Sequence, residues 1–316
     1  MNKDDFLDPS LLKSISIKDR EHIVDTSLFV EPTDPPEGLL SGFPDLLGGR
    51  SLKELCRKVA EARQGGRPVI MAMGAHVIKC GLSLLLIDLM ERGVITALAF
   101  NGAGAIHDWE IAFAGATSEK VADTLSDGSF GMVHETPRAI NGAARKASEE
   151  NLGFGEVLGR EIELSDLPYK AFSLFAAGYR LKIPVTVHVC LGCDTVHMHA
   201  DADGAAIGKA SMTDFQRLCR VTAELDGGVW LNIGSSVVLP EVFLKALSVT
   251  RNLKGAPQHF TAADLDMIRH YRPTQNVLSR PGGRSIALTG HHEIMIPLLR
   301  WGILSELEAL SKGKRA

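Results

Sequence analysis

The densest group of potentially catalytic or metal-binding side chains lies between residues 188 and 203. Imidazole, thiolate and carboxylate groups are the usual ligands of zinc and related ions. His197 and His199 alternate along the chain, so both rings would lie on one face of an extended strand. The spacing differs from that of a structural zinc knuckle, and two interpretations stay open: a metal site, or a polar loop that lines a substrate pocket. The candidate metal ligands are His188, Cys190, Cys193, His197 and His199.

A second polar group, residues 290–293, comes immediately before the last predicted helix. Histidine titrates near neutral pH, which suits proton transfer. A glutamate is also favourable in the first turn of a helix, so helix capping is the alternative interpretation of Glu293. Cys80 and Cys219, by contrast, are expected to be small buried apolar side chains. The predicted catalytic or substrate-lining residues are Asp194, His197, His291, His292 and Glu293.

Glycine-rich turns follow two apolar runs, at residues 74–81 and 101–104. Glycines let the backbone approach a pyrophosphate, and the start of a following helix stabilises its charge. The pair Gly102-x-Gly104 is not the G-x-G-x-x-G fingerprint, and glycines also occur simply because a turn is tight. Several such turns in one chain favour a nucleotide site.

The elements that would position these residues alternate along the chain. Short apolar runs, typical of buried strands, occupy residues 68–73, 95–100, 183–189, 228–233, 258–261 and 284–289. Helical segments are predicted at residues 51–64, 82–91, 108–114, 139–150, 172–181, 215–225, 240–248 and 294–311. This alternation predicts an α/β fold with a doubly wound, mostly parallel sheet. In such sheets ligands bind beyond the carboxyl ends of the strands, where the polar groups and glycine turns occur.

The domain organisation is expected to be simple. Residues 1–50 are rich in Asp, Pro and Gly and are predicted to be an arm that packs on the core. Residues 51–316 are predicted to form one α/β domain, with an insertion at about 116–165 near the mouth of the site.

The composition of the 316-residue chain excludes several classes of function. A net charge of −4 gives no electrostatic footprint for nucleic acid. No apolar stretch is long enough to span a membrane, and no secretory signal is visible. Five cysteines do not suggest a disulfide framework, so a cytoplasmic protein is expected.

Once the strand ends are placed in order, the sequence resembles deoxyhypusine synthase from about residue 50 to about residue 305. The most similar stretch is residues 74–117, which contains both glycine turns. Residues 183–185, 233–238 and 296–299 also match in order. Thr261 and Ala262, with Asp266, correspond to a Thr-Ala pair and a nearby Asp of the family.

The resemblance implies a Rossmann-like fold and a homotetramer that binds NAD at its subunit interfaces. Enzymes of the family transfer the aminobutyl group of spermidine to a lysine of a translation factor. NAD accepts a hydride, and an enzyme lysine forms an imine. The NAD-binding residues that the resemblance implies here are Gly74, His76, Gly81, Asn101, Gly102, Ala103, Gly104, Asp108, Gly234, Ser235, Thr261, Ala262 and Asp266.

The sequence departs from the family where the transfer chemistry takes place. Residues 275–280, which match the segment with the nucleophilic lysine, contain no lysine. Arg280 cannot replace it, because a guanidinium stays protonated. The family's His-His pair corresponds to Leu239 and Pro240, and a family Asp corresponds to His291.

We therefore predict an NAD-binding enzyme that acts on a small amine or related substrate, without a lysine imine. Three alternatives stay open. One is a metal-dependent enzyme that uses the ligands of residues 188–203. Another is deoxyhypusine synthase itself, with Lys209 or Lys245 as the lysine, and the third is a non-catalytic ligand-binding protein.

Overall fold

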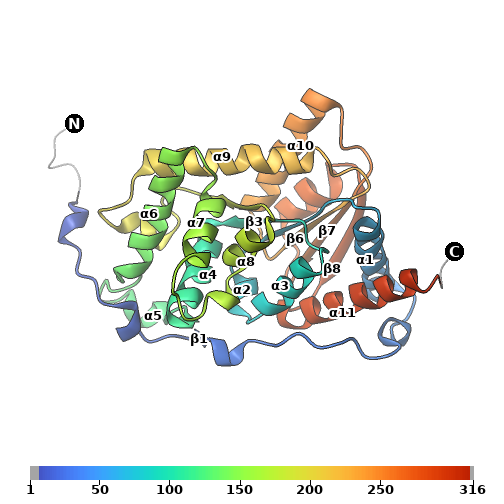
Figure 1. Cartoon of the computed structure of the whole chain (residues 1–316), viewed down its shortest axis with the longest axis horizontal. Helices are drawn as coiled ribbons and strands as arrows, with labels where there is room; N and C mark the ends of the chain where they lie inside the picture. Colours follow the sequence, from blue (N-terminus) through green and yellow to red (C-terminus); the bar gives the residue numbers. More distant parts are fainter. Residues whose placement is uncertain (1–6, 314–316) are drawn as a thin grey trace.

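Six parallel strands form the central sheet of the protein, for which we use a computed structural model that describes residues 7–313. Their spatial order is β5-β3-β2-β6-β7-β8; Figure 1 labels β3, β6, β7 and β8. The chain starts in the middle at β2, proceeds outward through β3 and β5, and then returns to the other side for β6, β7 and β8. This is the doubly wound order of a Rossmann-like fold, so the predicted fold class is confirmed. The strands are β2 (Val69–Met73), β3 (Ala97–Asn101), β5 (Val185–His188), β6 (Val229–Ile233), β7 (Thr261–Asp266) and β8 (Arg284–Thr289).

Helices cover both faces of the sheet, which explains why its inner strands are continuous apolar runs. Met71 and Met73 of β2 pack into a core shared with α1, α3, α4, α7, α8 and α11. The alternate residues Ile70 and Ala72 pack beneath α10 and the end of α9 (Figure 1). The larger helices are α1 (Leu47–Gln64), α3 (Ser83–Glu91), α4 (Gly102–Ala114), α6 (Glu135–Glu150), α7 (Phe154–Glu163), α8 (Leu174–Leu181), α9 (Gly204–Thr222), α10 (Val238–Lys254) and α11 (His292–Ser311). The short helices α2 (His76–Lys79) and α5 (Val121–Thr124) complete the set.

Two helices begin earlier than predicted because polar residues cap them. Asn101 accepts a hydrogen bond from the Gly104 N–H, so α4 starts at the glycine turn itself. Asp203 accepts hydrogen bonds from Ala205 and Ala206 and starts α9. Both are standard N-cap interactions. Each cap lies before the first residue of the apolar pattern from which the helix was predicted, so the predicted start was too late.

One strand prediction was wrong. The strand expected at residues 258–261 is β7, Thr261–Asp266, which includes two aspartates. Aspartate is rare in strands, so its presence concealed the element. Asp264 is nevertheless buried, and its carboxylate accepts a hydrogen bond from Asn232 on the neighbouring strand.

Residues 116–165 divide into an exposed stretch at 120–129 and a packed helical part. They contribute α6 and α7, which pack against α9 and α8, respectively, and bury Ile140, Val157 and Ile162. The division into an arm and one domain with an insertion stays a prediction.

The arm lies along the lower edge of the molecule in Figure 1. Its β1 (Val24–Asp25) pairs antiparallel with β4 (Ala116–Thr117). Arg20 of the arm forms a buried ion pair of 2.8 Å with Glu110 of α4. Residues 1–6 of the predicted arm lie outside the described residues. No helix of the described chain is long and apolar enough to cross a membrane.

Candidate functional site

The strand order of the sheet reverses between β2 and β6, and a glycine follows each of these strands. A Cβ atom on Gly74 would lie 2.3 Å from the carbonyl oxygen of Gly234. Gly234 has a φ of +62°, in the left-handed region that glycine adopts without strain. Only glycines therefore allow the two strand ends to come this close. Crevices at such reversal points are where doubly wound sheets bind their ligands.

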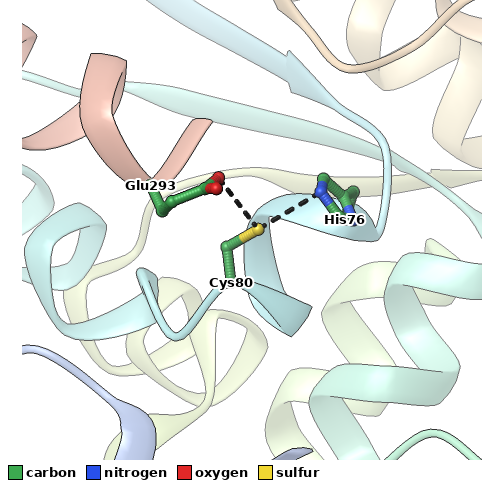
Figure 2. A group of neighbouring side chains, drawn as sticks. All are labelled: His76, Cys80 and Glu293. Carbon is green, nitrogen blue, oxygen red and sulfur yellow. Dashed lines mark hydrogen bonds between the residues drawn. The ribbon is translucent and has the colours of Figure 1, made fainter. Parts of the chain in front are cut away.

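Three side chains from two distant segments meet beside this crevice (Figure 2). Cys80 Sγ lies 3.3 Å from His76 Nε2 and 3.7 Å from Glu293 Oε2. His76 begins α2 and Cys80 follows its last residue, so the two share a face of one helical turn. Glu293 lies in the first turn of α11.

The protonation states of these three groups follow from their surroundings. Burial raises the pKa of the Cys80 thiol to about 11, and the Glu293 carboxylate adds to this effect. Burial lowers the pKa of His76, as do His292 and Lys79. A hydrogen bond from its backbone N–H lowers the pKa of Glu293. At neutral pH the group is thus a thiol, a neutral imidazole and a carboxylate.

His292 forms the wall of the crevice next to Gly234. Its ring is 5.5 Å from that of His76, centroid to centroid. Its Nε2 faces the Leu265 carbonyl oxygen at 3.3 Å, and its Nδ1 is buried without a hydrogen-bond partner. Buried polar atoms are rarely left unpaired, so Nδ1 marks a position where a ligand could donate a hydrogen bond.

Carboxylates from β7 make the same edge acidic. Burial raises the pKa of Asp264 to about 6. Asp266 accepts a hydrogen bond from the Met267 N–H, and His270 Nε2 lies 4.0 Å from its second oxygen. Together with Glu293, these groups suit a cationic ligand.

The second glycine turn is already occupied by the protein itself. A Cβ atom on Gly102 would lie 1.9 Å from a carboxylate oxygen of Asp194. The start of α4, where we predicted a phosphate, therefore faces a carboxylate of the same chain. Gly104 has a packing role, because its Cβ would lie 2.6 Å from the Phe100 ring. Ala103 lies between them in the first turn of α4.

Asp194 and His197 lie in a closed environment. With Asn141 they line a void of about 10 Å³, enough for roughly one water molecule. His197 Nδ1 accepts hydrogen bonds from the Gly192 and Asp194 N–H groups. Burial raises the pKa of Asp194 to about 6. Within the described residues no hydrogen bond or ion pair joins this pair to the predicted residues at 291–293.

The predicted metal ligands between residues 188 and 203 do not converge. His188 is buried and hydrogen-bonds Thr186, and burial lowers its pKa to about 3. His199 donates a hydrogen bond to the Gly131 carbonyl oxygen, and Cys190 and Cys193 are exposed. Within the described residues no three of these side chains bring their ligand atoms together, and a metal site there stays a prediction. In the part of the chain that the structure describes, one group of His, Cys, Asp and Glu ligand atoms lies within 4.8 Å: His76, Cys80 and Glu293.

Several predicted cofactor residues lie away from the crevice. Asp108 is buried and caps α8, accepting hydrogen bonds from Ser173 and the Leu174 N–H. Gly81 approaches the arm at the Leu28 carbonyl oxygen. Thr261 and Ala262 lie at the amino end of β7, opposite the crevice, because that strand starts where we expected it to end.

Of the predicted residues, Gly74, His76, Gly234, His291, His292, Glu293 and Asp266 follow β2, β6, β7 and β8 at this edge. Ser235 is also there and caps α10 by accepting a hydrogen bond from the Leu239 N–H. Sequence reasoning missed Cys80, which is half-buried rather than part of the core. Its spacing of four residues from His76 was the available signal.

A cavity of about 610 Å³ lies at the opposite, amino edge of the sheet, between Pro68, Thr96 and Pro184. Its charged rim includes Arg67, Arg220 and Glu224. We place the functional site at the carboxyl edge instead, because the glycine crevice, the imidazoles and the thiol are all there.

No family model and no curated protein matches this sequence. Among solved structures, a protein described as LOR/SDH from Methanococcus maripaludis S2 aligns with a TM-score of 0.50 and 18% identity, over 88% of this chain and 74% of that one. The arginine dihydrolase ArgZ, from the ornithine–ammonia cycle in cyanobacteria, aligns with a TM-score of 0.50 and 16% identity, over 82% of this chain. The aligned part is 33% of ArgZ.

A protein described as a deoxyhypusine synthase from Entamoeba histolytica also aligns, over 82% of this chain and 88% of that one. Its TM-score of 0.46 and identity of 7% are too low to add to the argument. This chain shares the fold of the LOR/SDH and ArgZ structures, a Rossmann-like α/β fold built on a parallel sheet.

Proposed function

We propose that this protein is an NAD-binding enzyme that acts on a small amine or a related substrate at the carboxyl edge of its sheet. The observation that carries the proposal is the contact between Gly74 and Gly234. This contact lies at the strand-order reversal, where a dinucleotide binds in Rossmann-like folds.

The residues present fit a dinucleotide there. The backbone of the turn at Gly234 would approach the dinucleotide, and the start of α10 after Ser235 would face a phosphate. Of the two turns considered, the one at Gly102 faces the Asp194 carboxylate, which would repel an anion, so the turn at Gly234 is the better position for a phosphate. Bound NAD would supply a hydride acceptor, and the chain's own groups would bind and orient the substrate.

The side chains around the crevice favour a cationic substrate. The carboxylates of Glu293 and Asp266 would attract an ammonium group. His76 is neutral at neutral pH and can accept a proton from that group, since burial lowers its pKa.

The positions of the lysines and of the segment that the family resemblance singles out argue against an imine at those positions. Residues 273–279 form a π-helical turn, followed by Arg280, whose guanidinium donates to Asn276. Lys245 is exposed on α10 and pairs with Glu241. Lys209 lies on the exposed side of α9.

The test is a calorimetric titration of the full chain with NAD, alongside the substitution Ser236→Glu. Ser236 is half-buried, lies between Gly234 and α10, and makes no hydrogen bond in the described structure. A carboxylate there should repel a phosphate and weaken NAD binding by about tenfold or more. Ser236→Gln is the matched control of similar size and should bind like the wild type.

Failure of the wild type to bind NAD would overturn the proposal, as would equal binding by the two variants. With binding established, a panel of small amines should give the absorbance of reduced nicotinamide. The predicted homotetramer is checked on the same samples by size-exclusion chromatography with light scattering.

A further inference from the structure

We propose that His76, Cys80 and Glu293 form a zinc site with an open fourth coordination position. The site is separate from the predicted cluster at residues 188–203 and does not depend on NAD binding.

Two of the separations between the ligand atoms, those from the sulfur, match those of a tetrahedral zinc site. The sulfur–nitrogen distance is 3.3 Å and the sulfur–oxygen distance is 3.7 Å. All three ligand atoms lie within 4.8 Å of one another. Zinc bonds of about 2.0–2.3 Å place tetrahedral ligands about 3.3–3.8 Å apart, so small side-chain rotations would complete the site. Figure 2 shows the imidazole of His76 and the carboxylate of Glu293 on either side of the Cys80 sulfur, each within reach of it.

The local fold holds these ligands in place. His76 and Cys80 are four residues apart on one helical turn, so they point the same way. Val77 and Ile78 of that turn are fully buried and anchor it to the core. Glu293 follows His292, which is 1% exposed and fixes the start of α11.

The chemistry of the three ligands selects for zinc among common divalent ions. A thiolate and an imidazole favour zinc over magnesium or calcium, which prefer oxygen ligands. The thiolate and the carboxylate would together balance the 2+ charge. Three protein ligands leave one position for water or substrate, which is the composition of a catalytic rather than a structural site.

The open position would lie next to the crevice between β2 and β6. Zinc there would act as a Lewis acid that polarises an oxygen or nitrogen atom of the substrate. His76, assigned above to proton transfer, would then act as a ligand instead, so metal content decides between these two roles.

The test uses cobalt(II) as a spectroscopic probe on full-length, chelator-treated protein without NAD. One cobalt per chain should bind and give a thiolate-to-cobalt charge-transfer band and the intense visible bands of a tetrahedral site. Zinc should then displace the cobalt. Cys80→Ser should abolish the charge-transfer band and weaken binding by about 100-fold or more, since even outer-shell changes cost about 10–100-fold. Glu293→Gln should weaken binding but keep the band.

The matched control is the double substitution Cys190→Ser with Cys193→Ser, which removes the exposed cysteine pair. It should leave the cobalt spectrum unchanged. Absence of stoichiometric cobalt would overturn the proposal, as would a band that survives Cys80→Ser or is lost in the control. Thermal unfolding of each variant shows whether it is folded. An NAD titration of the metal-free protein separates failure of this site from failure of the proposed function.

Discussion

The ring of His292 occupies the space that a side chain of residue 234 would need. A Cβ atom on Gly234 would lie 2.5 Å from His292 Cε1. One residue ends β6 and the other begins α11, so this contact joins two elements that meet only in the folded sheet. It also forms one wall of the proposed binding crevice.

Replacement of Gly234 by alanine should therefore destabilise the protein in two ways. The left-handed backbone costs about 1–2 kcal/mol for a non-glycine residue, and the overlap with His292 adds about 1–3 kcal/mol. In the background of His292→Ala only the backbone cost should remain. Urea denaturation of the wild type, both single variants and the double variant measures this coupling. An equal cost in the two backgrounds would contradict the steric account.

Gly102 and Asp194 offer a second test. Alanine at residue 102 should destabilise the wild type but stabilise a variant that lacks the Asp194 side chain. Gly102→Ala should cost about 1–3 kcal/mol, because its Cβ would overlap the Asp194 carboxylate. In the background of Asp194→Gly the overlap disappears. There, alanine should stabilise helix α4 by about 0.5–1 kcal/mol relative to glycine. Chemical denaturation gives both values, and destabilisation in both backgrounds would rule out this contact as the cause.

The arm should depend on the buried ion pairs that Arg20 makes with Glu110 and Glu119. Burial acts to raise the pKa of Glu110, but hydrogen bonding and attraction from Arg20 outweigh burial and lower it. Removing Arg20 would leave a buried, unpaired carboxylate, so Arg20→Ala should cost about 3–5 kcal/mol. Arg50→Ala, at an exposed pair with Asp45, is the control and should cost less than about 1 kcal/mol. Similar losses in the two variants, measured by denaturant unfolding, would argue against a special role for the buried pairs.

Asp214 should give the protein an unusual dependence of stability on pH. Its carboxylate accepts hydrogen bonds from the Gly155 and Val187 N–H groups, but its second oxygen is buried without a partner. Burial outweighs these bonds and raises the pKa from 3.8 to about 7. The folded state therefore holds a proton that the unfolded state has lost, and this contribution to stability falls as pH rises from about 4 to about 7.

Asp214→Asn removes this titration. The difference in unfolding free energy between wild type and variant should change steadily across that pH range and be flat above it. Denaturant curves at a series of pH values measure the difference directly. Other titrating groups, such as His188, are present in both proteins, so their contributions to the pH dependence cancel in the difference. A constant difference would show that Asp214 is ionised throughout.

The fold was largely predictable because its signals are local. The apolar runs of β2, β3 and β6 must be buried on both faces, and alternation with helices leaves few arrangements for them. The predicted position of β7 was wrong because the strand contains Asp264, which is stabilised by Asn232, a partner on another strand. Local propensity carries no information about such a partner.

The candidate site was predictable only in part. The sequence alone determined that glycines and imidazoles follow the strands, since the residues after each apolar run can be identified directly. Only the tertiary structure decided which of them meet. It joined Cys80 to Glu293, filled the Gly102 turn with Asp194, and separated the histidines of residues 188–203. These outcomes depend on distances between segments far apart in the chain, which the packing of helices on the sheet sets and residue spacing does not encode.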